Sequence, residues 1–218
     1  MRVSRISLVL FVALMALVLA TSASATTVTM TYEGHQGAVA IDGSPYIGYP
    51  YYFSINNSKT FTPLMCDSYD NVVSLGQTFQ ATVSPFLTGI ANSMFGPSMT
   101  LDYKAAGLIF KSMLAGNLDR AQAQWAIWGL FSTNAQTNPF FTTIGGAAID
   151  ATYLAQAQTA GNGAYAGLLL YTPLGAKPGI GPQEFIGYSA VPEPTSLTLM
   201  GTGLIGLAGM IRRKLAKA

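Results

Sequence analysis

Two residues of this chain have side chains that could react with each other, the single cysteine Cys66 and the glutamine Gln124. Gln124 belongs to the stretch AQAQWAIWGLF, and on a helix it would share an apolar face with Ile127 and Trp128. A carboxamide buried there without partners costs about 1–3 kcal/mol. Attack of the thiol on the carboxamide carbon would expel ammonia and join the two side chains. The sequence therefore raises the hypothesis of an internal Cys66–Gln124 thioester.

The residues around Gln124 favour such a bond, because thioesters are lost to water and to amines. Trp125, Ile127 and Trp128 would surround the bond and exclude water. A less specific interpretation also fits these residues. Gln124 would then lie at the boundary of an ordinary amphipathic helix and bond the backbone, and Cys66 would be a small buried apolar residue.

Other chemistry has weaker support. His35 is the only histidine, so a Cys66–His35 pair is the one His-based nucleophile available, and its context YEGHQGA is typical of a turn. Asp67, Asp70 and Asn71 could offer oxygens to Ca²⁺, but their spacing matches no complete loop motif and favours a turn. We find no phosphate loop, zinc spacing or nucleotide fingerprint, and we expect no metal, no cofactor and no enzyme activity. A secreted cysteine-dependent hydrolase is the least favoured interpretation.

The first 25 residues are typical of a secretory signal peptide. Arg2 and Arg5 precede an apolar run at residues 6–20, and the triplet Ala-Ser-Ala follows at residues 23–25. A basic start, an apolar middle and a small-residue stop predict cleavage after Ala25. The alternative is an anchor helix that is not cleaved.

Residues 191–218 have a second targeting pattern. Val-Pro-Glu-Pro precedes residues 195–211, which contain no charge and are long enough for a short transmembrane helix, and a tail beginning Arg-Arg-Lys follows. This order resembles the PEP-CTERM sorting signal, in which the motif residues are Pro192, Glu193 and Pro194. The resemblance implies processing by an exosortase and only transient membrane attachment through residues 195–211. A plain C-terminal anchor is the alternative.

The net charge of the chain is misleading as a guide to its partners. The chain has 11 basic and 9 acidic residues. The two targeting segments contain six of the basic residues and one of the acidic ones, so residues 26–190 keep 5 basic and 8 acidic residues, a net charge of −3. We therefore expect no nucleic-acid binding.

Residues 26–190 are predicted to form one α+β domain, β-rich with a short helical insertion. We expect strands at residues 26–34, where apolar and polar residues alternate, and in the run YPYYFSI. Residues 71–86 would form a strand pair that turns near Gly76. Cys66 would end a further strand. Residues 101–116 predict a helix with Leu108, Phe110 and Leu114 on one side. A second helix would run from an Asn117 N-cap to Phe131 and a third over residues 147–160, before strands at 166–173 and 183–190.

The pairing of a strand-end cysteine with QWAIW (residues 124–128) resembles the thioester domains of bacterial surface adhesins. Cys66 and Gln124 match the reacting residues of that family, and Ala123 stands where the family usually has Thr. The resemblance implies covalent capture of an amine or hydroxyl on a partner.

We therefore expect an exported bacterial protein of the cell surface or extracellular matrix. Its partners would be an exosortase and a polysaccharide or other surface molecule with an amine or hydroxyl. A non-covalent structural component of the biofilm matrix, without a thioester, is the main alternative.

Overall fold

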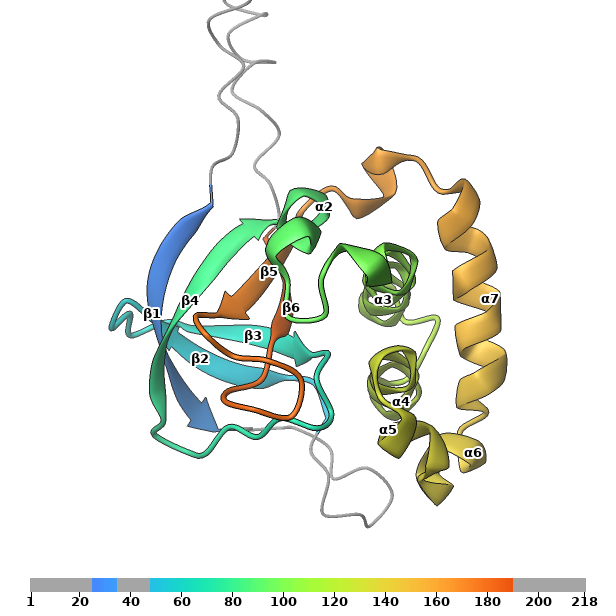
Figure 1. Ribbon diagram of the computed structural model, residues 1–218, viewed down its shortest axis with the longest axis horizontal. Coiled ribbons are helices and arrows are strands. Elements are labelled where there is room, and N and C mark those ends of the chain that lie inside the picture. Colours follow the sequence, from blue (N-terminus) through green and yellow to red (C-terminus); the bar gives the residue numbers. More distant parts are fainter. Residues whose placement is uncertain (1–24, 35–47, 190–218) are drawn as a thin grey trace, which may run out of the picture.

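A computed structural model describes residues 25–34 and 48–189 of the chain. The strands close into an antiparallel barrel with the order β1-β2-β3-β6-β5-β4. They are β1 (Thr26–Gly34), β2 (Tyr51–Ile55), β3 (Phe61–Cys66), β4 (Thr78–Pro85), β5 (Leu168–Pro173) and β6 (Phe185–Tyr188). The helices lie between β4 and β5 in the sequence and on one side of the barrel in space (Figure 1). The predicted β-rich domain with inserted helices is confirmed.

The helical segment is longer than the short insertion expected from the sequence. Its α-helices are α2 (Phe86–Gly89), α3 (Thr100–Leu114), α4 (Arg120–Phe131), α5 (Thr133–Thr137), α6 (Pro139–Thr143) and α7 (Gly146–Thr159), and its 3₁₀ turns are η1 (Ile90–Asn92), η2 (Pro97–Met99) and η3 (Asn162–Tyr165). α3 and α4 lie between the barrel and α7 (Figure 1). We did not predict the short helices α2, α5 and α6. Ser132 and Asn138 cap α5 and α6, and Pro139 opens α6, so capping signals were present.

Most predicted strands are confirmed, and one is wrong. β1 buries Val28, Met30 and Tyr32 on one face, as its alternation predicted. Residues 71–86 contain a single strand, β4, so they do not form the predicted strand pair. The segment before β4 turns at Gly76, which has a φ of 77° and donates its N–H to the Tyr32 carbonyl oxygen at 2.8 Å. Together with the bond from the Tyr32 N–H to the Gln77 carbonyl oxygen at 3.0 Å, this bond holds the segment against β1.

Two details of the helices also differ from expectation. The N-cap of α4 is Asp119 instead of Asn117, because Asp119 Oδ1 accepts the Gln122 N–H at 2.7 Å and Gln122 Oε1 accepts the Asp119 N–H at 3.2 Å. This reciprocal capping box satisfies two N–H groups of the first turn. Leu114 at the end of α3 is 42 % exposed, because the buried face of α3 runs through Phe110 and Met113.

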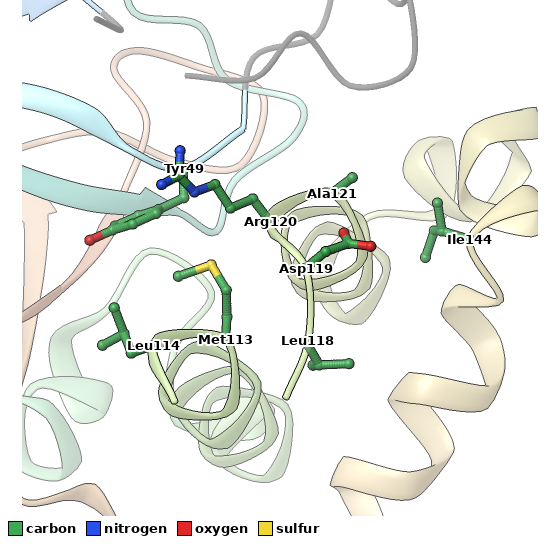
Figure 2. A pocket seen from close by; sticks show the side chains of 8 residues that line it. All are labelled: Tyr49, Met113, Leu114, Leu118, Asp119, Arg120, Ala121 and Ile144. Atoms are coloured by element: carbon green, nitrogen blue, oxygen red, sulfur yellow. The ribbon is translucent and has the colours of Figure 1, made fainter. Parts of the chain in front are cut away.

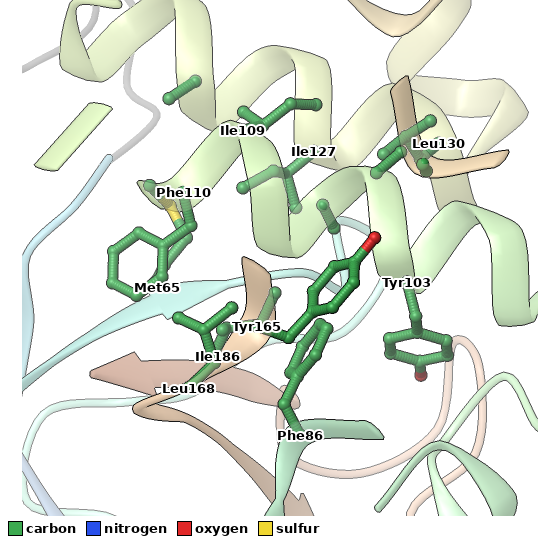
Figure 3. Packing of buried hydrophobic residues seen from close by; sticks show 14 of the residues in the cluster. Met65, Phe86, Tyr103, Ile109, Phe110, Ile127, Leu130, Tyr165, Leu168 and Ile186 are labelled. Carbon is green, nitrogen blue, oxygen red and sulfur yellow. The ribbon is translucent and has the colours of Figure 1, made fainter. Parts of the chain in front are cut away.

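The core has two parts that meet at β3. Side chains alternate along a strand, so Leu64 and Cys66 point into the barrel while Met65 points out of it. The inner cluster contains residues of all six strands together with Trp125 and Trp128 of α4. The outer cluster fills the space between the barrel and the helices (Figure 3). α4 contributes to both clusters, so the helix is positioned at the end of the barrel where β3 stops.

Candidate functional site

Cys66 lies inside the barrel at the end of β3. It is the register partner of Phe185 on β6, and its side chain is fully buried. The Trp128 indole Nε1 donates to Cys66 Sγ at 3.4 Å, and Sγ lies 3.6 Å from the Ser68 carbonyl oxygen, to which it donates. The prediction that Cys66 ends a strand is confirmed, and its burial fits both the thioester and the less specific interpretation.

α4 places the side chain of Gln124 in contact with Cys66. The Gln124 side chain is fully buried, and its Nε2 donates to the Cys66 carbonyl oxygen at 2.6 Å across 58 positions of sequence. The other end of the carboxamide, Oε1, accepts no hydrogen bond from the described residues. The structure therefore places together the two residues that the sequence singled out, with half of the carboxamide unsatisfied.

Aromatic rings cover this end of the barrel. The rings of Trp125 and Trp128 meet edge to face with centroids 5.1 Å apart, and Tyr69 and Phe140 pack against them. Both tryptophans belong to the inner cluster with Cys66. Ile127 is also buried but belongs to the outer cluster, on the other side of α4 from these rings. Water is thus excluded around Cys66 by the tryptophans and Tyr69.

The electrostatics of the site keep the thiol protonated. Burial and the neighbouring Asp67 together raise the pKa of Cys66 to about 12, against the opposing hydrogen bonds of Trp128 and Ser68. A thiolate is the reactive form of cysteine. Any reaction of Cys66 at neutral pH therefore requires a group that removes its proton at the time of attack.

A pair of buried acids, not anticipated from the sequence, lies beside Cys66. Asp67 follows Cys66, and its N–H donates to the Glu184 carbonyl oxygen at 3.2 Å, which continues the β3–β6 ladder by one residue. Both side chains are fully buried. Burial and the charge of Glu184 raise the pKa of Asp67 well above its usual range, and burial raises the pKa of Glu184. A hydrogen bond to Glu184 contributes to the same shift, and its direction favours the protonated form of Asp67.

The remaining candidate residues do not assemble into a site. Asp70 Oδ1 accepts from Asn134 Nδ2 at 2.7 Å, whereas Asn71 binds backbone groups of the loop before β6, including the Gly179 N–H at 2.9 Å. They and Asp67 therefore point to different partners, as expected for a turn. In the described part of the chain no group of three or more His, Cys, Asp or Glu residues could hold a metal ion. His35 lies outside the described residues.

A cleft opens next to the first turn of α4 (Figure 2). It has a volume of about 550 Å³. Its lining residues are Tyr49, Met113, Leu114, Leu118, Asp119, Arg120, Ala121 and Ile144. Arg120 extends toward Tyr49 and lowers the pKa of its hydroxyl, although burial keeps that pKa above the usual value. Gln124 lies one helical turn after Arg120 in α4 and does not line the cleft.

The two targeting segments, residues 1–25 and 191–218, fall outside what the structure describes apart from Ala25. Within residues 25–34 and 48–189, no helix is both long and apolar enough to span a membrane. Comparisons with curated proteins and with solved structures found no match. The resemblance to thioester domains therefore rests on Cys66 and the QWAIW stretch alone.

One comparison identifies the end of the chain. Residues 190–214 match the family described as the PEP-CTERM protein-sorting motif, and this range includes Pro192, Glu193 and Pro194. The predicted sorting signal is thereby confirmed. The chain carries a PEP-CTERM motif, which supports its assignment as an exosortase substrate and indicates an exported protein that passes through the membrane to the cell surface.

Proposed function

We propose that this domain forms an internal thioester between Cys66 and Gln124 and uses it to attach covalently to a partner at the cell surface or in the matrix. One observation supports this more than any other. The Gln124 carboxamide donates to the Cys66 carbonyl oxygen at 2.6 Å, while its own oxygen is buried and accepts from no donor within residues 25–34 and 48–189. An unsatisfied amide oxygen of this kind costs about 1–3 kcal/mol, and the cost is smaller for a thioester oxygen, which is a weaker hydrogen-bond acceptor than an amide oxygen.

The bond-forming step balances without a co-reactant. Cys66 Sγ attacks the Gln124 Cδ atom, the S–C bond forms, and the C–N bond breaks. The leaving nitrogen departs as ammonia with the proton that the thiol loses. The N–H₂ group, which donates to the Cys66 carbonyl oxygen, is thereby replaced by a C–S bond that needs no hydrogen-bond acceptor, while Oε1 stays in the product as the thioester carbonyl oxygen.

Capture of a partner reverses the same chemistry. An amine or hydroxyl of the partner attacks the thioester carbonyl, the C–S bond breaks, and Cys66 regains its proton. Trp125 and Trp128 support this proposal because they keep water, the competing nucleophile, away until a partner arrives. Export to the cell surface gives the domain access to polysaccharides and proteins that have such groups.

Intact mass tests the proposal. We expect the exported protein, purified without amines, to weigh one ammonia less than its sequence, and methylamine should add to Gln124 with release of one thiol. Cys66→Ala and Gln124→Ala should each abolish the deficit. Gln122→Ala is the matched control from the same helix and should retain the deficit. A wild-type protein of full mass, with one thiol that alkylates after unfolding, would contradict the thioester.

That contradicting result would favour the alternative, a non-covalent component of the matrix. In that case, Cys66 would be a buried apolar residue and Trp128 its packing partner. A cysteine hydrolase predicts a third result, alkylation of the native protein, and the raised pKa of the buried thiol argues against it.

A further inference from the structure

A second cavity lies among the helices, and neither Cys66 nor Gln124 lines it. Residues of α3, α4, α5, α6 and α7 form its walls, and these helices lie together on one side of the barrel (Figure 1). Its volume is about 350 Å³, which falls within the range of small-molecule sites. The exposed residues Ala147 and Ala151 of α7 form its solvent side. The cavity is therefore open to a ligand from outside.

The inner wall of this cavity contains a buried acid, Asp150 of α7. Its side chain is only 8 % exposed, and its Oδ1 accepts no hydrogen bond from the described residues. A Cβ atom built on Gly129 would lie 2.9 Å from Asp150 Oδ2 and 2.2 Å from Cε2 of Phe141. The carboxyl group and the aromatic ring are thus neighbours at the wall formed by α4. A charged carboxylate buried in such a place destabilises the fold unless a cation pairs with it.

The other polar groups of the cavity add to its negative character. Asp102 in the first turn of α3 also lines it, and the helix dipole accounts for Asp102 but not for Asp150, which lies beyond the first turn of α7. Gln136 donates its Nε2 to the Gly129 carbonyl oxygen at 2.7 Å, which leaves its Oε1 as an acceptor. Among the described residues, no basic side chain lines the cavity. Its side chains therefore offer acceptors and negative charge to a ligand.

We propose that this cavity binds an organic cation, a primary ammonium group on a short apolar chain. Asp150 accepts hydrogen bonds from the ammonium group, the charge of Asp102 attracts it, and the ring of Phe141 adds a cation–π contact. Leu130 and Leu154 offer apolar surface to the chain. A free alkylamine and the lysine side chain of a partner protein share this chemistry. The inference is independent of the thioester.

A divalent metal ion fits the cavity less well than an organic cation. Ca²⁺ takes about six to eight oxygen ligands. In the described ranges of the chain, no group of three or more His, Cys, Asp or Glu residues could hold a metal ion. The large apolar share of the lining would also leave a hydrated ion without partners, whereas it suits an alkyl chain.

Calorimetric titration of the full-length chain in a non-ionic detergent with n-butylamine tests the proposal. Each chain is first treated with methylamine, which opens any thioester, and is then dialysed, so that the result does not depend on the proposed function. We expect n-butanol, which has the same shape without the charge, to bind at least about tenfold more weakly. Asp150→Asn should weaken binding of n-butylamine at least about tenfold, since hydrogen bonds to charged groups are the strong ones.

Two further variants separate the cavity from the general charge of the protein. Ala151→Phe narrows the opening without changing any charge and should also weaken binding at least about tenfold. Glu33→Gln removes a negative charge from β1 on the barrel and should bind n-butylamine like the wild type. Binding of n-butylamine no tighter than that of n-butanol would overturn the proposal, and so would unchanged binding in either Asp150→Asn or Ala151→Phe. Binding of Ca²⁺ without binding of n-butylamine would overturn the assigned ligand class.

The pH dependence of binding gives a readout that a change in shape alone would not produce. Burial and the charge of Asp102 raise the pKa of Asp150 to about 7, and the described residues of α4, α5 and α6 that line the cavity include no titratable group. Since the ammonium group binds the carboxylate, n-butylamine should bind about tenfold more tightly at about pH 8 than at about pH 6. Asp150→Asn should lose this dependence, and a wild type with equal affinity at both pH values would overturn the role of Asp150.

The source of the ammonium group is distinguished by a second probe. Nα-acetyl-lysine methylamide presents the same group on a peptide-like backbone. Binding of both probes with the same dependence on Asp150 supports the proposal with a lysine side chain as the ligand. Binding of n-butylamine alone supports it with a free alkylamine.

Discussion

Replacing Gly129 with alanine should destabilise this protein, although the same change stabilises most helices. Gly129 is in the interior of α4, where alanine is normally favoured over glycine by about 1 kcal/mol. A Cβ atom added there would lie 2.2 Å from Cε2 of Phe141 and 2.9 Å from Oδ2 of Asp150. Contacts this short require the aromatic ring or the helix to move.

The magnitude depends on whether Phe141 can give way. Its ring also packs against Gly146, where an added Cβ would lie 2.3 Å from the ring, so the ring is held between the backbones of α4 and α7. Overpacking of a filled core typically costs about 1–3 kcal/mol, and a 2.2 Å overlap belongs at the upper end of that range. After the gain in helix propensity, Gly129→Ala should lower the free energy of unfolding by about 2 kcal/mol.

Urea unfolding of the purified chain measures this loss, with two controls. Ala155→Gly, at an exposed position of α7, reports the intrinsic difference between the two residues in this protein. The double variant Gly129→Ala/Phe141→Leu frees space for the new methyl group, so its cost should be well below the sum of the single changes. A Gly129→Ala protein as stable as the wild type would refute the packing described for α4, and with it the fixed placement of Gln124.

Four further outcomes follow from the structure. Gln122→Ala removes half of the α4 capping box and should cost about 0.5–1 kcal/mol in urea unfolding. Trp128→Phe removes the indole donor to Cys66 Sγ and should cost about 1–2 kcal/mol while speeding loss of the thioester to water. Burial and the charge of a neighbouring aspartate raise the pKa of Asp150 to about 7. The stability that its neutral carboxyl group contributes is therefore fully present below about pH 4, the pKa in the unfolded chain, and is lost as pH rises through about 7. Asp150→Asn should therefore raise Tm relative to the wild type at about pH 8 and not at about pH 4. Epitope tags on either side of residues 190–214 should separate in a host with an exosortase, and one species with both tags would contradict processing.

Patterns confined to a few neighbouring residues predicted most of the fold. Alternation in β1 and the helical spacing of α4 depend on which face of a short element is buried, and both are visible in a window of about ten residues. The contact between Cys66 and Gln124 was predicted for a different reason. Each residue was a chemical anomaly in its own segment, and one reaction explained both, so their proximity did not have to be worked out from the topology.

Features that depend on competition between neighbouring signals were predicted less well. Asn117 and Asp119 are both good N-caps, and the choice between them is made by Gln122, which completes a box only with Asp119. Leu114 has the right spacing for the buried side of α3, but α3 ends there and the barrel does not reach it. In each case the deciding partner lies outside the pattern used for the prediction.

Local sequence patterns could not predict the pair formed by Asp67 and Glu184, and the positions of the two residues explain why. Asp67 was assigned to a turn, and Glu184 fell within the strand predicted at residues 183–190. They meet only because β3 pairs with β6, on the far side of the helical segment in sequence, and a single sequence does not reveal which strands become neighbours. Like charges placed directly opposite each other destabilise a sheet, so local rules argue against this arrangement. Four residues that break such rules, Cys66, Asp67, Gln124 and Glu184, lie together at one end of the barrel, and breaches of this kind concentrate at functional sites. Their clustering is therefore itself an argument that this end of the barrel does chemistry.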